Sequence, residues 1–179
     1  RMIGSGLQGV MFAVRFASIR LNKEIIGPRV NAADQFQFRI TATNTGAVLA
    51  SGTTSGTGNG PFAAAALSLA SGIPLTLSET MAAGSASTLA QYRSTLTCTN
   101  SSGATSTPLP TNVVTTSYSL GSLQFGDSLI CTFRNGAHPR VQLSKALGTG
   151  GRRFAGDQFT VRIRNGSTTV ASATTSGTS

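Results

Sequence analysis

The chain has 179 residues, enough for one domain of ordinary size and part of another. Hydrophobic residues make up 39% of the sequence and charged residues only 11%, and much of the remainder is Gly, Ser and Thr. This composition favours short strands joined by small-residue turns, and it disfavours long helices.

The net charge of +9 comes mainly from arginines, which are scattered singly or in pairs such as Arg152 and Arg153. There is no basic run with interleaved aromatic residues, so we expect no nucleic-acid partner. The longest apolar candidate, GVMFAVRFA at 9–17, is far shorter than the ~20 residues of a membrane span, and we expect none. Since the chain starts on Arg1 without a signal peptide, we interpret it as a mature or excised piece of an exported protein.

The predicted elements are strands bounded by turn segments such as IGPR, NTG, SGTGNGP and NSSG. Seven strands are expected, and an eighth is a candidate at 113–120. In chain order, the seven lie near 18–25, 35–42, 46–53, 64–70, 73–80, 92–99 and 128–135. This pattern predicts an all-β fold, an antiparallel Greek-key β-sandwich.

An internal repeat divides the chain. The segment IRLNKEIIGPRVNAADQFQFRI at 19–40 recurs as VQLSKALGTGGRRFAGDQFTVRI at 141–163, and ASGTTSGT at 50–57 recurs as ASATTSGT at 171–178. We therefore expect an N-terminal extension at 1–17, a β-sandwich repeat at 18–138 and an incomplete second repeat at 139–179. The two lysines of the chain, Lys23 and Lys145, occupy the same position of the two repeats.

Cys98 and Cys131 lie in two stretches that alternate like strands, STLTCTN and SLICTFRN. One interpretation is a disulfide between neighbouring strands in an oxidising compartment. The alternative is a pair of buried free thiols. A metal site is not expected, because two cysteines and His138 lack the spacing of a ligand set.

Strand periodicity also directs three polar side chains into the apolar layer. Lys23 shares a face with Ile19 and Leu21, although lysine is almost never buried without a partner. By the same count, Glu79 follows Leu75 and Leu77 inward, and Asn135 follows Cys131 and Phe133 inward.

The order LNK, LSETMAAGS, CTFRN resembles the prealbumin-like CnaB/SpaA domains of bacterial surface proteins and pili. The resemblance covers residues 18 to about 136 and the opening of the second repeat from 141. It implies an intramolecular isopeptide bond, with Lys23 as nucleophile, Asn135 as acceptor and Glu79 as proton shuttle. The proline and tyrosine that follow the glutamate in that family are missing after Glu79.

The chemistry of the three groups supports that reading. Burial favours the neutral amine and the neutral acid, and a neutral Lys23 amine can attack the Asn135 carbonyl while Glu79 relays the proton to departing ammonia. Two alternatives remain. The first is a buried Lys23–Glu79 ion pair with no covalent bond, and the second is a Lys23 side chain that reaches solvent at the strand end. Lys145 has no downstream partner for an intrachain copy.

These observations predict a structural subunit of an extracellular bacterial fibre, stalk or filament at the cell surface. The alternative is an adhesin that binds anionic glycan or host surfaces. No cofactor is expected, and any catalysis is limited to one autocatalytic turnover. The incomplete second repeat would expose strand edges, which predicts self-association by strand addition with residues 1–17 as the candidate donor strand.

Overall fold

The computed structural model describes residues 16–64, 66–69, 72–102 and 108–177. The chain divides between His138 and Pro139 into two compact units. Residues 1–15, most of the expected donor strand, lie outside the described residues.

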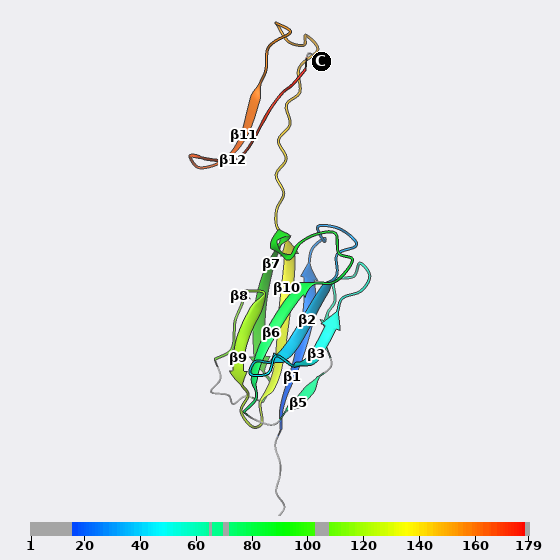
Figure 1. The fold of residues 1–179 in the computed structure, drawn as a ribbon, viewed down its shortest axis with the longest axis vertical. Coiled ribbons are helices and arrows are strands. Elements are labelled where there is room, and N and C mark those ends of the chain that lie inside the picture. The colour runs from blue at the N-terminus through cyan, green and yellow to red at the C-terminus, as the bar shows by residue number, and fades with distance from the viewer. Residues whose placement is uncertain (1–15, 65, 70–71, 103–107, 178–179) are drawn as a thin grey trace, which may run out of the picture. The chain divides into compact units, whose positions relative to one another are not determined.

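The first unit consists of short strands with one turn of 3-10 helix (Figure 1). In chain order the elements are β1 (Ala17–Ile26), β2 (Phe36–Ala42), β3 (Val48–Thr53), β4 (Phe62–Ala63), β5 (Leu67–Leu69), β6 (Pro74–Met81), η1 (Leu89–Gln91), β7 (Tyr92–Asn100), β8 (Val113–Val114), β9 (Ser117–Ser122) and β10 (Ser128–Ala137).

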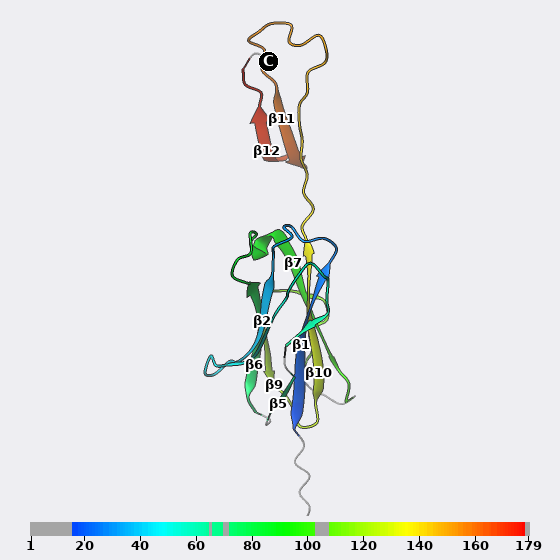
Figure 2. The same ribbon diagram turned by 90° about the vertical axis from the view of Figure 1, so that its right-hand side faces the viewer.

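These strands form two sheets, which the views in Figures 1 and 2 show as two layers. One sheet has the order β4-β1-β10-β7-β8, with β5 also paired to β1, and the other has the order β3-β2-β6-β9. Pairing between the described strands is antiparallel except between β1 and β10, the first and last strands of the unit, which run parallel side by side. The expected all-β sandwich is confirmed.

Burial alternates along the long strands as the sequence pattern predicts. The residues that point inward from the two sheets form a large apolar cluster, and Ile25, Phe36 and Tyr92 form a smaller second cluster. The largest fully buried apolar side chains are Phe36, Phe38, Phe133, Ile19, Leu21, Ile40, Leu75, Leu77, Leu96 and Leu129.

Two expected strands differ from those in the structure. In the stretch predicted as one strand at 64–70, the described residues form only the short β5, which pairs with β1, as does β4 just before it. The candidate strand at 113–120 is two strands in different sheets, β8 beside β7 and β9 beside β6. The chain passes from one sheet to the other within this segment, and the strand propensity of the residues does not indicate where it does so.

The second unit contains one antiparallel hairpin, β11 (Thr160–Asn165) and β12 (Thr168–Thr174). Its hydrogen bonds repeat those of the first unit. The Phe36 N–H donates to Thr54 Oγ1 at 2.9 Å, and the Phe159 N–H donates to Thr175 Oγ1 at the same distance. The repeat in the sequence is therefore also a repeat in local structure.

At one cross-strand pair of positions, both residues differ between the two units, and the differences in side-chain volume compensate each other. Phe38 faces Gly52 across the β2–β3 pair, and a Cβ at Gly52 would lie 2.5 Å from the Phe38 ring. The equivalent pair in the second unit is Val161 facing Ala173. The smaller side chain at position 161 leaves room for the methyl group at position 173, which indicates that the two hairpins have equivalent faces at this pair of positions.

Candidate functional site

Three strands place the predicted polar side chains inside the sandwich. Lys23 lies on β1 and Asn135 on the adjacent β10, where Lys23 pairs with Phe133 and Ile25 pairs with Asn135. Glu79 lies on β6 in the opposite sheet. Lys23 and Asn135 are fully buried and Glu79 is 3% exposed, so the structure places all three predicted residues in the core.

Lys23 and Glu79 are in direct contact. The Lys23 ammonium donates a hydrogen bond to Glu79 Oε2, and the two side chains form an ion pair fully shielded from solvent. Lys23 Nζ also lies 4.6 Å from the centre of the Phe36 ring and 5.8 Å from that of Phe133. The Lys23 side chain therefore does not reach solvent at the strand end, which rules out the second alternative.

Burial lowers the pKa of Lys23 from 10.5 to about 8, although the charge and the hydrogen bond of Glu79 act in the opposite direction. An amine with a pKa near 8 has a sizeable neutral fraction at neutral to slightly alkaline pH. The neutral form carries the lone pair that a nucleophile needs.

Asn135 is unusual among the buried polar side chains. Neither its Nδ2 nor its Oδ1 has a hydrogen-bond partner among the described residues, and Glu79 Oε1 also has none. Buried polar groups are nearly always paired, because an unpaired one costs about 1–3 kcal/mol. The core thus holds an unpaired amide next to β1, together with an amine and a carboxyl group, which are the three kinds of group that an amide exchange uses.

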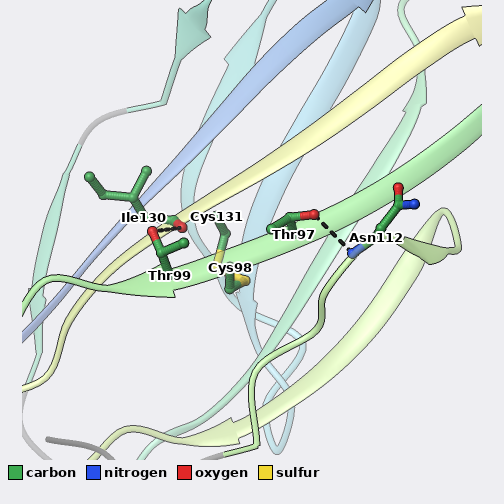
Figure 3. The surroundings of a disulfide bond; sticks show 6 residues. All are labelled: Thr97, Cys98, Thr99, Asn112, Ile130 and Cys131. Atoms are coloured by element: carbon green, nitrogen blue, oxygen red, sulfur yellow. Dashed lines mark hydrogen bonds between the residues drawn. A yellow bond between two sulfur atoms is a disulfide. The ribbon is translucent and has the colours of Figure 1, made fainter. Parts of the chain in front are cut away.

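The two cysteines form the expected disulfide, with an S–S distance of 2.02 Å (Figure 3). Cys98 on β7 and Cys131 on β10 are direct cross-strand partners. The bridge closes a loop of 33 residues, which contributes about 3–4 kcal/mol in the chain-entropy model. Cys131 and Asn135 therefore lie on the same strand, β10.

Lys145 occupies the same position in the second unit but a different environment. Its side chain is exposed, and its Nζ lies 5.0 Å from the centre of the Phe159 ring, much as Lys23 lies over Phe36. Among the described residues it forms no ion pair. The lysine–phenylalanine arrangement is thus repeated without the acid and the amide.

Asp34 is a second buried charged residue, and its partners could not be predicted from the sequence. The buried carboxylate of Asp34 accepts hydrogen bonds from the N–H groups of Asn31 and Ser87 and from the Tyr92 hydroxyl. Burial raises the pKa of Asp34, but these hydrogen bonds outweigh it and hold the pKa below 3.8. Burial and the bond to Asp34 raise the pKa of Tyr92 to about 12.

This cluster joins three parts of the chain near one end of the sandwich, since the Tyr92 oxygen in turn accepts from the Val30 N–H at 2.8 Å. In the sequence, Asp-Gln-Phe recurs at 34–36 and 157–159, and this pattern indicates turn or strand capping but not the Tyr92 partner. Tyr92 has no counterpart in the second unit, so the repeat could not indicate it.

Among the described residues, no helix is long and apolar enough to cross a membrane. No group of three or more His, Cys, Asp or Glu side chains is arranged to hold a metal ion in that part of the chain.

Solved structures with a similar arrangement include a pilin and an adhesin. The major pilin protein from Streptococcus pyogenes is 10% identical, with 69% of this chain and 46% of the pilin covered and a TM-score of 0.40. A Mobiluncus mulieris adhesin containing intramolecular disulfide, isopeptide and ester bond cross-links is 15% identical, with coverages of 70% and 42% and a TM-score of 0.38. The chain spans less than half the length of each. A search of curated protein sequences found no match.

The comparison with protein families gives a specific assignment. The SpaA-type family described as a prealbumin-like fold domain matches residues 18–137 and matches again at 140–179. This result confirms the resemblance found in the LNK, LSET and CTFRN segments. The chain belongs to the prealbumin-like fold domain family, which matches two successive segments of it.

Proposed function

We propose that this chain is a structural segment of an extracellular bacterial surface fibre, built from prealbumin-like domains in succession. The observation that carries the proposal is the buried cluster of Lys23, Glu79 and Asn135 beside a disulfide-linked strand. The titratable groups gathered there lie inside the core and not in a cleft, which supports bracing of the domain over binding or turnover. The disulfide supports an oxidising, extracellular location.

The brace we propose is an intramolecular isopeptide bond. The neutral Lys23 amine attacks Cγ of Asn135, and Glu79 in its protonated form polarises the carbonyl. A bond forms between Lys23 Nζ and Asn135 Cγ, the bond between Cγ and Nδ2 breaks, and one proton passes from Nζ through Glu79 to Nδ2. Ammonia leaves, and the product amide removes the cost of a buried charge.

The strand order supports a mechanical role for this bond. Because β1 and β10 are parallel neighbours, force applied between the two ends of the unit pulls them in opposite directions and shears their shared hydrogen bonds. A covalent link from Lys23 to Asn135 would carry the load directly between the first and last strands. Residues 24–134 would then be shielded from force.

Single-molecule stretching of the full chain tests this role. We expect the wild-type chain to show no extension from residues 24–134, and Lys23→Ala to show unfolding of the first unit under force. In Lys23→Ala, the segment between Cys98 and Cys131 should extend only after reduction. Lys145→Ala is the matched control, and it should behave as wild type. Full extension of the first unit in the wild-type chain would contradict the proposal.

Self-association by strand addition is the second part of the proposal. In the second unit, Leu143, Val161 and Ile163 line a small cavity of about 100 Å³ on the hairpin. Val141 and Val170 are 73% and 59% exposed. In the first unit, the residues equivalent to Val141 and Leu143 are Ile19 and Leu21, and both are fully buried. An added strand would cover this face and pair with the edge of the hairpin.

The expected extension at 1–17 ends earlier in the structure, because Ala17 is the first residue of β1 and is buried in the first unit. Residues 1–15 of a second copy are therefore the donor we propose, because this segment is largely apolar and lies outside the repeat. Light scattering after size exclusion should show association of the full chain and loss of association when residues 1–15 are deleted, a deletion that leaves β1 intact. A monomeric full chain in which residues 139–179 resist protease would contradict strand addition. That result would leave the isopeptide proposal unaffected.

A further inference from the structure

A cavity of about 370 Å³ opens beside β7, close to the end of the first unit that carries η1. It lies where this pairing ends, because β8 pairs with only two residues of β7, Thr95 and Leu96, and no described strand pairs with Tyr92 or Arg93 on that side. The cavity is lined by residues of η1, β7 and the connection from β8 to β9.

Ser94 connects this cavity to the buried amide. It lines the cavity, and it is the direct cross-strand partner of Asn135, so the two side chains project from the same inward face. Ser94 is 3% exposed, and its hydroxyl has no hydrogen-bond partner among the described residues. Because the Ser94 hydroxyl is unpaired and lies next to Asn135, it can form a hydrogen bond with a product released from the Asn135 amide.

A second lining residue connects the cavity to the acid. The Thr116 carbonyl accepts a hydrogen bond from the Glu79 N–H at 2.9 Å, and Thr116 lines the same cavity. The neighbouring Thr115 N–H donates to the Ser94 carbonyl at 3.1 Å. Backbone hydrogen bonds therefore link residues 115–116, which line the cavity, to both β6 and β7.

We propose that this cavity is the exit route for the ammonia released from Asn135, and that the Ser94 hydroxyl receives it. The inference rests on the proposed isopeptide bond. As the bond between Asn135 Cγ and Nδ2 breaks, the departing ammonia donates an N–H to Ser94 Oγ and then passes into the cavity. Ammonia is close to water in size, and one water-sized molecule needs only about 10–15 Å³ of accessible space. Without a hydrogen-bond acceptor beside Asn135, ammonia stays in the core between the two sheets. It can then attack the new amide, which reverses the reaction.

The test compares two substitutions of nearly equal shape, Ser94→Thr and Ser94→Val. The full chain is made by cell-free synthesis, samples are quenched in acid at successive times, and each sample is weighed intact by mass spectrometry. The loss of one ammonia reports the isopeptide bond, and the loss of two hydrogens reports the Cys98–Cys131 disulfide. The disulfide lies between the same two strands as Ser94 and Asn135, so it serves as an internal clock for folding.

We expect Ser94→Thr, which keeps the hydroxyl, to lose ammonia within about twofold of the wild-type rate. Ser94→Val should lose ammonia about tenfold more slowly, the effect of one lost hydrogen bond, with disulfide formation unchanged. Thr99→Val, an exposed position on the same strand, should behave as wild type. Equal rates for the Thr and Val variants, or a delay shared with the disulfide, would overturn the role of Ser94. A wild-type chain that never loses ammonia would overturn the isopeptide proposal and this inference with it.

Discussion

Lys23 and Glu79 form an ion pair across the two sheets, and neither side chain is exposed to solvent. Removing one partner of a buried pair leaves an uncompensated charge, which typically costs about 3–5 kcal/mol. In the Asn135→Ala background, where no isopeptide bond forms, we therefore expect Glu79→Ala to lower the free energy of unfolding by about that amount. In the otherwise wild-type chain, we expect Glu79→Ala to abolish the loss of ammonia. Urea unfolding followed by intact mass measurement checks both results.

The matched control for Glu79→Ala is Ser78→Ala, on the same strand with its side chain on the other face. It should change the free energy of unfolding by less than about 0.5 kcal/mol and leave the isopeptide bond intact. A Glu79→Ala chain that still loses ammonia at the wild-type rate would show that Glu79 is not the proton shuttle.

The lowered pKa of Lys23 predicts a pH dependence that is visible only when the bond is blocked. In Asn135→Ala, the unfolded chain holds the Lys23 proton up to about pH 10.5, whereas the folded chain releases it near pH 8. The unfolded state binds more protons in that window, so stability rises with pH, by up to about 1.4 kcal/mol per pH unit.

Denaturant unfolding of Asn135→Ala between about pH 7.5 and 9.5 measures this rise. The range stops there because Tyr92, with a pKa raised to about 12, contributes the opposite slope above pH 10. The double variant Lys23→Met/Asn135→Ala should show a flatter profile. Identical slopes in the two variants would mean that Lys23 does not titrate in the core.

Gly52 and Phe38 should be energetically coupled. Gly52→Ala places a methyl group 2.5 Å from the Phe38 ring and should cost about 1–3 kcal/mol, while Phe38→Val leaves a cavity and should also destabilise the unit. The double variant recreates the Val161–Ala173 pair of the second unit. We expect its cost to fall short of the sum of the single costs by at least about 1 kcal/mol.

A double-mutant cycle in urea measures that coupling. Additive costs would contradict the interpretation that the two hairpins have equivalent faces at this pair of positions.

Asp34 should stabilise the end of the first unit mainly through its hydrogen bonds to Tyr92 and to backbone N–H groups. Asp34→Asn loses part of these bonds and should cost about 1.5–3 kcal/mol at pH 7. Because the folded pKa lies below 3.8, this stability is present above pH 3.8 and is lost as the pH falls through the folded value. The variant should therefore show a shallower loss of stability in acid than the wild-type chain.

Asp157→Asn is the control, since Asp157 is partly exposed and its carboxylate accepts a hydrogen bond from the backbone N–H of Phe154. It should leave the unfolding of the first unit unchanged. An equally steep acid transition in Asp34→Asn and wild type would show that other carboxyl groups dominate it.

The inward direction of Lys23, Glu79 and Asn135 could be predicted from the sequence because a period of two fixes the face of each side chain. The pairing of β1 with β10 could not, because neighbours in a sheet that lie more than 100 residues apart depend on the tertiary fold. Ser94 was missed for the same reason. Its significance comes from its position opposite Asn135, and a serine in a strand carries no signal of its own.

The intact mass of the purified chain, measured with and without reduction, tests the central claim most directly. We predict a mass lower than the sequence mass by one ammonia and two hydrogens, with only the two hydrogens restored on reduction. Fragmentation should map the ammonia loss to a link between Lys23 and Asn135, and Lys23→Ala should abolish it. A wild-type chain that lacks only two hydrogens would contradict the account. It would leave Lys23 and Glu79 as a buried ion pair and the disulfide as the covalent brace.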